Sequence, residues 1–267
     1  MKKLFLLLDE FTYLPVPKKL TAPKDELPSA MRYLPVLGLI CGLVLFLCAR
    51  SLRILPPGGS AAVMVGMMLL LGGGKLLRPL MTTASGMTND IFSADNGRPL
   101  HPENEKELTA RSWRYYTTRS GLAWGGVWVI TIYIIYLLFL ALPGASYYAF
   151  IIGPVFCFWL MCWAVYYFKA SGSAKLHREF SRRDMLISSL ITLMTVIPFS
   201  CFALWMSMMI AFFGIYLFAY HRLRSAGGLD ESCYGAICGW AQLLFLLAWF
   251  VFDRFGGGFG KMLIDML

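Results

Sequence analysis

The sequence contains several apolar runs that are each long enough to cross a lipid bilayer as one helix. A crossing helix needs about 20 mainly apolar residues, within a range of about 17–25. Hydrophobic residues make up 58% of the 267-residue chain and charged residues only 15%, which is far from the composition of a water-soluble domain. The chain is therefore predicted to be an all-α, polytopic integral membrane protein, with a single membrane domain over residues 1–267.

These runs predict about seven transmembrane helices. The run Met185–Tyr220 has 36 residues, which is too long for one span. Pro198 near its middle predicts a break, because proline removes a helix hydrogen bond. The predicted spans cover about Tyr33–Ala49, Ala61–Gly74, Gly121–Leu142, Ser146–Phe168, two spans within Met185–Tyr220, and Gly235–Phe252.

Three segments outside the spans also carry structural signals. The N-terminal run Leu4–Leu8 is too short to span, and it predicts an interfacial helix that ends at Pro15. Pro56-Pro57-Gly58-Gly59 is typical of a turn, here between the first two spans. A glycine-rich tail, Gly256–Gly260, follows the last span.

The basic residues predict the orientation of the spans. With the N-terminus inside, the inside segments 1–32, 75–119, 169–183 and 221–234 hold 6, 7, 5 and 2 Lys or Arg residues, 20 of the 24 in the chain. Cytoplasmic loops carry such an excess. The formal charge of +9 therefore reports orientation, and nucleic acid is not expected as a partner. The N-terminus and the loop at about 75–119 are predicted to face the cytoplasm.

That loop is the polar part of a long stretch between two spans, Gly73–Arg119, which holds seven Lys or Arg residues and five carboxylates. Loops of this length inside a compact domain are usually functional or disordered. Two interpretations are open: a solvated connector, or a surface at the membrane face that handles phosphate or nucleotide groups.

Four segments along nearly the whole chain resemble one family, cobalamin synthase (adenosylcobinamide-GDP ribazoletransferase). Each segment is similar to a motif of that family, and their order and spacing agree with it. The segments are Phe11-Thr12-Tyr13-Leu14-Pro15-Val16-Pro17, Arg32-Tyr33-Leu34-Pro35-Val36-Leu37-Gly38, Gly153-Pro154-Val155 with Trp159, and Gly227-Gly228-Leu229 through Gly235-Ala236.

The chain departs from this family where the family is acidic. Arg78, Thr82 and Ser85 stand where the family's signature has three aspartates, and Leu76 stands where it has a histidine. Further along, Thr117-Thr118-Arg119-Ser120-Gly121 keeps the arginine of another motif but lacks its aspartate. Phe158 replaces the arginine that precedes the tryptophan, and Ser232 replaces an aspartate in the C-terminal motif, beside Asp230 and Glu231.

The resemblance implies a transfer of nucleotide-activated cobinamide onto α-ribazole with release of GMP, in the last steps of cobalamin biosynthesis. Mg²⁺ is implied as cofactor, because phosphoryl transfer uses a metal ion to neutralise charge on the bridging oxygens. Arg78, Thr82 and Ser85 cannot hold Mg²⁺ as three carboxylates would, but they could contact a phosphate. The implied location is the bacterial inner membrane, with a homo-oligomer or other pathway proteins as further candidate partners.

Three hypotheses follow from the resemblance and its gaps. The first is a divergent, active enzyme. The second is a catalytically lapsed relative that still binds a phosphorylated or corrinoid ligand or a pathway partner. The third is a membrane scaffold or transporter component. For an active enzyme the predicted residues are Asn89, Asp90 and Asp95 for the metal, Arg119, Asp230 and Glu231 for catalysis, and Arg78, Thr82, Thr83, Ser85 and Ser232 for binding of the phosphorylated substrate.

Overall fold

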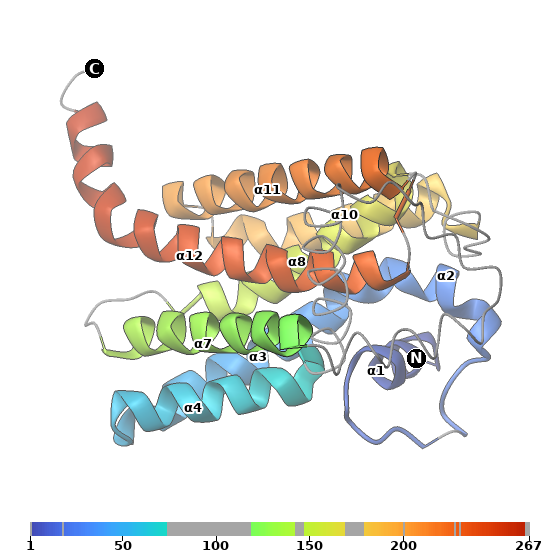
Figure 1. The fold of residues 1–267 in the computed structure, drawn as a ribbon, viewed down its shortest axis with the longest axis horizontal. Coiled ribbons are helices and arrows are strands. Elements are labelled where there is room, and N and C mark those ends of the chain that lie inside the picture. Colours follow the sequence, from blue (N-terminus) through green and yellow to red (C-terminus); the bar gives the residue numbers. More distant parts are fainter. Residues whose placement is uncertain are drawn as a thin grey trace.

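The protein is a bundle of helices in the computed structural model (Figure 1). The structure describes residues 2–17, 19–73, 119–141, 147–168, 179–199, 201–226, 228–229 and 231–264. The elements are α1 (Lys2–Phe11), the 3-10 turn η1 (Lys24–Glu26), α2 (Leu27–Ala30), η2 (Met31–Tyr33), α3 (Leu34–Ser51), η3 (Leu52–Ile54), α4 (Pro57–Met68), the π-helical turn η4 (Leu69–Gly73), α7 (Arg119–Ala141), α8 (Ala149–Tyr167), α10 (Arg182–Val196), η5 (Ile197–Phe199), α11 (Phe202–Ala226) and α12 (Glu231–Ile264).

The helices show that this is an all-α membrane protein that crosses the bilayer several times. Each predicted span overlaps one of α3, α4, α7, α8, α10, α11 and α12. Within the described ranges, four helical stretches are long and apolar enough to cross a membrane: Leu27–Ile54, Ala149–Tyr167, Phe202–Arg224 and Cys233–Arg254. The apolar helices Pro57–Gly72 and Gly125–Ala141 are shorter. Helix α10 belongs to neither group, so its role as a span stays a prediction.

Helix α8 is the centre of the bundle. Fifteen of its 19 residues are buried, as expected for a helix that is apolar on every side. It packs against α3, α10, α11 and α12, while α4 pairs with α7 and α11 pairs with α12. Figure 1 shows these helices running roughly parallel or antiparallel to one another.

Helices α3 and α8 approach each other backbone to backbone. Gly38 and Gly42 lie one turn apart on α3 and face the main chain of α8. A Cβ atom on Gly38 would lie 2.7 Å from the Pro154 carbonyl oxygen, and one on Gly42 would lie 2.6 Å from that of Ile151. Small residues spaced in this way let two membrane helices approach backbone to backbone.

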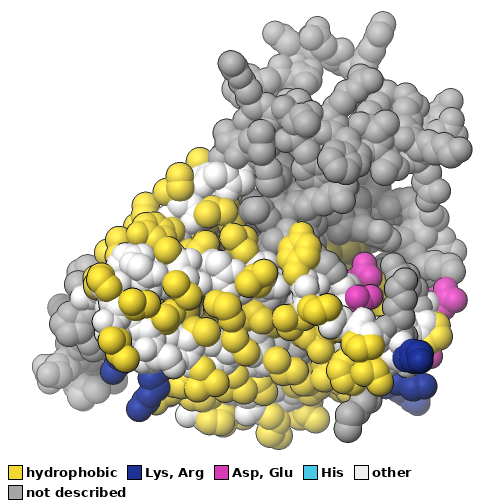
Figure 2. Space-filling model, turned by 90° about the horizontal axis from the view of Figure 1, so that it is seen from below, with side chains coloured by type: hydrophobic (Ala, Val, Ile, Leu, Met, Phe, Trp, Pro, Cys, Tyr) yellow, Lys and Arg dark blue, Asp and Glu magenta, His cyan; other side chains and the backbone are white. Residues whose placement is uncertain are grey.

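The outer surface carries the pattern of a protein that lies across a bilayer. Figure 2 shows hydrophobic side chains over the middle of one face, with Lys and Arg side chains toward its two ends. Large apolar side chains are exposed on several of the long helices, among them Leu47, Val63, Ile130, Leu190 and Phe213. Exposed apolar area on this scale marks an interaction surface, here with lipid.

The break at Pro198 is confirmed. Helix α10 ends at Val196, the turn η5 contains Pro198, and α11 begins at Phe202. The two helices then separate, because α10 packs mainly on α8 and α11 mainly on α12.

The helix ends differ from the sequence prediction in three places. Pro56-Pro57-Gly58-Gly59 is not a turn, since α4 already begins at Pro57, a residue whose missing N–H is tolerated in the first turn of a helix. Helix α1 ends at Phe11, four residues before Pro15. Helix α12 continues through Gly256–Gly260 to Ile264 instead of ending near Phe252.

The predicted inside segments gather at one end of the bundle. Their described parts are α1 and α2, the start of α10, the end of α11 and the start of α12, and all lie toward the right of Figure 1. Arg50 and Arg53, which were predicted to lie outside, belong to the opposite end of α3 and to η3. For the described residues, the basic side chains of the predicted inside segments and those of Arg50 and Arg53 thus lie at opposite ends of the bundle, while the rest of the partition and the membrane side of each end stay predictions.

Candidate functional site

The candidate site residues fall only partly within the described chain. Arg119 is the first residue of α7, and Glu231 and Ser232 are the first two of α12. The remaining candidates lie outside the described residues: Arg78, Thr82, Thr83, Ser85, Asn89, Asp90, Asp95 and Asp230. The predicted convergence of these residues in one cleft therefore stays a prediction. The structure does describe the residues at the two limits of the polar stretch, at the end of η4 and at the start of α7.

The N-terminal segment is tied to the end of α4. The Thr12 hydroxyl donates to the Leu8 carbonyl at 2.6 Å and accepts the Leu14 N–H at 3.2 Å, which closes α1. The next residue reaches across, and the Tyr13 N–H donates to the Leu70 carbonyl at 3.2 Å. This junction joins the first segment of the family resemblance to the beginning of the polar stretch.

Gly72 at this junction has a backbone conformation that favours glycine. Its φ is +137°, which residues with a Cβ rarely adopt. A Cβ atom there would also lie 2.9 Å from the Phe11 carbonyl oxygen. Both constraints fix the backbone of η4 where it meets the end of α1.

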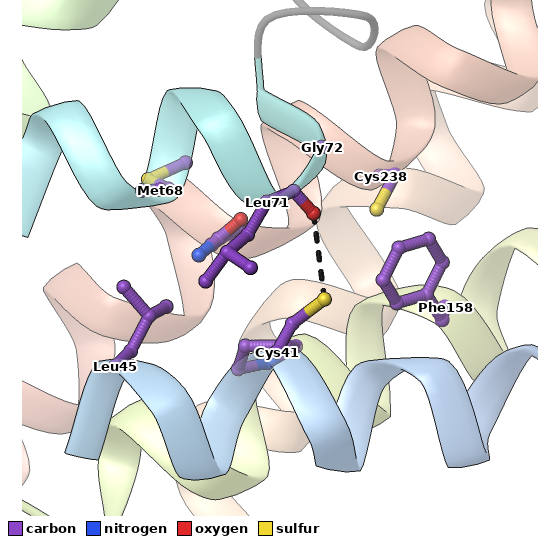
Figure 3. Close-up of a pocket in the computed structure, with 9 residues that line it drawn as sticks. Cys41, Leu45, Met68, Leu71, Gly72, Phe158 and Cys238 are labelled. Carbon is purple, nitrogen blue, oxygen red and sulfur yellow. Dashed lines mark hydrogen bonds between the residues drawn. The ribbon is translucent and has the colours of Figure 1, made fainter. Parts of the chain in front are cut away.

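A small cavity lies beside the junction (Figure 3). Its volume is about 20 Å³, enough for about one water molecule. Its lining comes from α3, α4, η4, α8 and α12, and includes Leu71, Phe158, Cys238 and Gln242. The Cys41 thiol donates to the Leu71 carbonyl at 3.4 Å and links α3 to the end of α4. The cavity is too small to be a substrate pocket. We call the packed, largely apolar residues that line it the floor.

Phe158 is one of the departures from the family resemblance that the structure describes. Its side chain is 3% exposed and lines the cavity of Figure 3. Its ring meets the Phe11 ring edge to face, with centroids 6.2 Å apart. Where the resemblance would place an arginine, this chain has an apolar contact that helps to hold α1 in place.

The described polar groups at the same end include a cluster around Asp184, which the sequence interpretation missed. Arg32 in η2 donates from Nη1 to the Asp184 carboxylate at 3.3 Å. The other carboxylate oxygen of Asp184 accepts from the Ser181 hydroxyl at 2.6 Å and from the Ser181 N–H at 3.1 Å. This is a capping box for α10, and the spacing Ser181-x-x-Asp184 before an apolar run was the signal that could have revealed it.

The described residues do not supply a metal site at this end. No group of three or more His, Cys, Asp or Glu side chains in the described ranges is placed to hold a metal ion. Asp184 already has Arg32 and Ser181 as partners. The described residues therefore do not by themselves make a Mg²⁺ site.

Comparison with known proteins gives one match. The sequence profile of the cobalamin-5-phosphate synthase family matches residues 3–89 and 118–250. The matched ranges include Arg78, Thr82, Thr83, Ser85, Asn89, Arg119, Asp230, Glu231 and Ser232, and leave out Asp90 and Asp95. No curated protein and no solved structure matches the chain.

Proposed function

The chain belongs to the cobalamin-5-phosphate synthase family, and we propose that it joins nucleotide-activated cobinamide to α-ribazole and releases GMP. Membership supports a role in cobalamin synthesis with corrinoid-type substrates. The observation that carries the proposal is the extent of the match, on both sides of residues 90–117. In agreement with it, residues of both matched ranges line the cavity of Figure 3: Gly72 from 3–89, and Phe158 and Cys238 from 118–250.

In the proposed reaction the α-ribazole hydroxyl oxygen attacks the phosphorus atom that is bonded to cobinamide. A new P–O bond forms, the pyrophosphate P–O bond breaks, and GMP leaves with the electron pair. Asp230 and Glu231 are the candidate bases that accept the hydroxyl proton. Arg119 would offset charge on the phosphate oxygens, and Arg78 would contact them through charge-assisted hydrogen bonds.

Thr82, Thr83, Ser85 and Ser232 are proposed to donate hydroxyl hydrogen bonds to the same phosphates. Mg²⁺, if it is the cofactor, would neutralise charge on the bridging oxygens. The proposed ligands are Asn89, Asp90 and Asp95. The family profile does not match the last two, so their role rests on the chemistry of their side chains alone.

The second candidate function is ligand binding without catalysis, as in a catalytically lapsed relative of the family. Arg78, Thr82 and Ser85 replace acids of the resemblance, and the described floor carries Phe158 instead of an arginine. A chain of this kind would still bind the phosphorylated corrinoid but would not release GMP.

An assay of the purified protein separates the two functions. The protein in detergent is incubated with cobinamide-GDP, α-ribazole and Mg²⁺, and GMP release is measured together with ligand binding. The family name refers to cobalamin 5-phosphate, so α-ribazole phosphate is tested as a second acceptor. GMP release with either acceptor supports the transferase, and binding without release supports the lapsed relative. Absence of both contradicts both candidates.

Variants then test the roles that are proposed for the acidic residues. Asp230→Asn and Glu231→Gln are expected to reduce GMP release at saturating substrate, and Asp90→Asn is expected to raise the Mg²⁺ concentration that is needed. Glu179→Gln is the matched control, because Glu179 is an exposed carboxylate just before α10, at the same end of the bundle. An unchanged Mg²⁺ requirement in Asp90→Asn would exclude Asp90 as a ligand.

The cell inner membrane, with the N-terminus in the cytoplasm, is proposed as the location. The positions of the described basic residues support it, since those of the predicted inside segments, such as Lys2, Arg32 and Arg182, belong to elements at the end of the bundle with α1.

A further inference from the structure

A groove with a volume of about 690 Å³ lies between α1, η1, η2 and the first turn of α3. This volume falls within the range of small-molecule sites. The groove is separate from the floor of Figure 3 and shares no lining residue with it.

One part of the groove is basic. Lys2, Lys3 and Arg32 line it, and among the described residues Glu26 is the one acidic residue of the lining. The Lys3 ammonium group is held by the Ser29 hydroxyl at 2.7 Å and by the Glu26 carboxylate at 3.4 Å. Glu26 is therefore already paired, and an excess of positive charge remains for a ligand.

Arg32 has donor capacity left over. Its Nη1 pairs with Asp184, and its guanidinium group lies 4.8 Å from the centroid of the Tyr33 ring. Its Nε is buried and has no hydrogen-bond partner in the described part of the chain. The Arg32 side chain as a whole is 27% exposed beside the groove, and a guanidinium group is well suited to phosphate oxygens.

The rest of the groove is largely apolar, and it lies where the chain enters the membrane. Leu4, Ala22, Pro23 and Val36 line this part. Val36 belongs to the first turn of α3, within the stretch Leu27–Ile54 that is long and apolar enough to span the bilayer. A ligand that fills the groove would therefore place a negative group on the basic part and an apolar group beside the first span.

We propose that this groove binds one anionic phospholipid, with its phosphate on Lys2 and Arg32 and the beginning of an acyl chain beside Leu4 and Val36. Basic pockets beside membrane helices recognise anionic lipid headgroups in this way. Exposed Tyr13, Leu14 and Leu20 place the N-terminal segment at the membrane surface, where such a lipid is present at high local concentration. The bound lipid would join α1 to the start of α3. The proposal does not depend on the transfer reaction.

The test is native mass spectrometry of the purified full-length protein in detergent, titrated with dioctanoyl phosphatidylglycerol or dioctanoyl phosphatidylcholine. One phosphatidylglycerol molecule is expected to bind, and to bind tighter than phosphatidylcholine. Lys2→Gln is expected to weaken phosphatidylglycerol binding about fivefold, which corresponds to about 1 kcal/mol for one basic residue near a membrane surface. Lys19→Gln, at an exposed lysine that does not line the groove, is expected to leave binding unchanged.

A second variant and a competition experiment complete the test. Arg32→Gln is expected to weaken binding more than Lys2→Gln; if it does not fold, Lys2→Gln alone decides. Equal binding of the two lipids, or equal loss in Lys2→Gln and Lys19→Gln, would overturn the proposal. Displacement of phosphatidylglycerol by millimolar inorganic phosphate or glycerol phosphate would show a site for free phosphate, and would likewise overturn the lipid assignment.

Discussion

Replacement of Gly42 by alanine tests the close contact between α3 and α8. The added Cβ would lie 2.6 Å from the Ile151 carbonyl oxygen, 2.8 Å from the Ile151 Cα and 2.9 Å from the Phe150 carbonyl oxygen. All three are backbone atoms, so no side chain can rotate away. Ordinary contact begins near 3.4 Å, and the two main chains would have to separate by about 0.8 Å.

The expected energy has two parts of opposite sign. Overpacking of a well-packed interior costs about 1–3 kcal/mol. Alanine also favours the helix over glycine by about 0.8–1 kcal/mol. Gly66→Ala is the matched control, because Gly66 lies inside α4 and a Cβ there would meet nothing within 4 Å. The helix preference is common to both variants, so the difference between them isolates the packing cost, about 1–3 kcal/mol.

This difference is measured by unfolding the purified protein in detergent with increasing SDS and following its tryptophan fluorescence. Gly42→Ala is expected to unfold at lower SDS than the wild type, and Gly66→Ala at the same or higher SDS. Gly38→Ala should resemble Gly42→Ala, and the double variant should cost less than the sum of the two, because one separation of the helices relieves both contacts. Equal shifts in Gly42→Ala and Gly66→Ala would refute the backbone contact.

Three further outcomes are expected. A cysteine at Asn96 should not react with a membrane-impermeant thiol reagent added to intact cells, because the polar stretch is predicted to face the cytoplasm; labelling from outside would reverse the topology. Arg78→Ala should weaken calorimetric binding of a GDP-linked ligand about tenfold or more, since a hydrogen bond to a charged group contributes about 1.5–3 kcal/mol, and unchanged binding would remove Arg78 from the phosphate site. Gly72→Ala should destabilise the protein relative to Gly59→Ala, because only Gly72 has a positive φ and a close backbone neighbour; equal stability would show that the junction with α1 adapts freely.

The sequence predicted the features that depend on local composition. Apolar runs located the long helices, and Pro198 located the break between α10 and α11, because both signals act within a few residues. The helix starts and ends were less well predicted. Pro57 is compatible with a turn and with the first turn of a helix, and the packing of α4 on α7 decides in favour of the helix.

Features that join distant parts of the chain had no sequence signal. Arg32 and Asp184 are 152 residues apart, and neither residue type identifies its partner. Gly38 and Gly42 form a small-residue pattern, but the partner helix is known only from the packing of α3 on α8. The candidate site residues lie mostly in the polar stretch, where no apolar periodicity guides a structural prediction. For that reason the family resemblance was the main source of the proposed roles.

Phe158→Arg tests whether position 158, where the family resemblance would place an arginine, can still accommodate a charged side chain in this chain. The side chain is 3% exposed, and no described carboxylate lines the cavity that it faces. An arginine there would be a buried charge without a partner among the described residues, at a cost of several kcal/mol. It would also lose the ring contact with Phe11, which contributes about 0.5–1.5 kcal/mol.

Phe158→Leu is the control, because it removes the ring contact but keeps the position apolar, and it is expected to cost less than Phe158→Arg. The SDS unfolding assay should therefore rank wild type, Phe158→Leu and Phe158→Arg in order of decreasing stability. If Phe158→Arg instead matched Phe158→Leu in stability and increased GMP release, an anionic group must reach this position, either an acid of the polar stretch or a substrate phosphate. The floor would then be part of the phosphate site. Phe158 would be a substitution that reduced activity, and its contact with α1 would not be the reason for it.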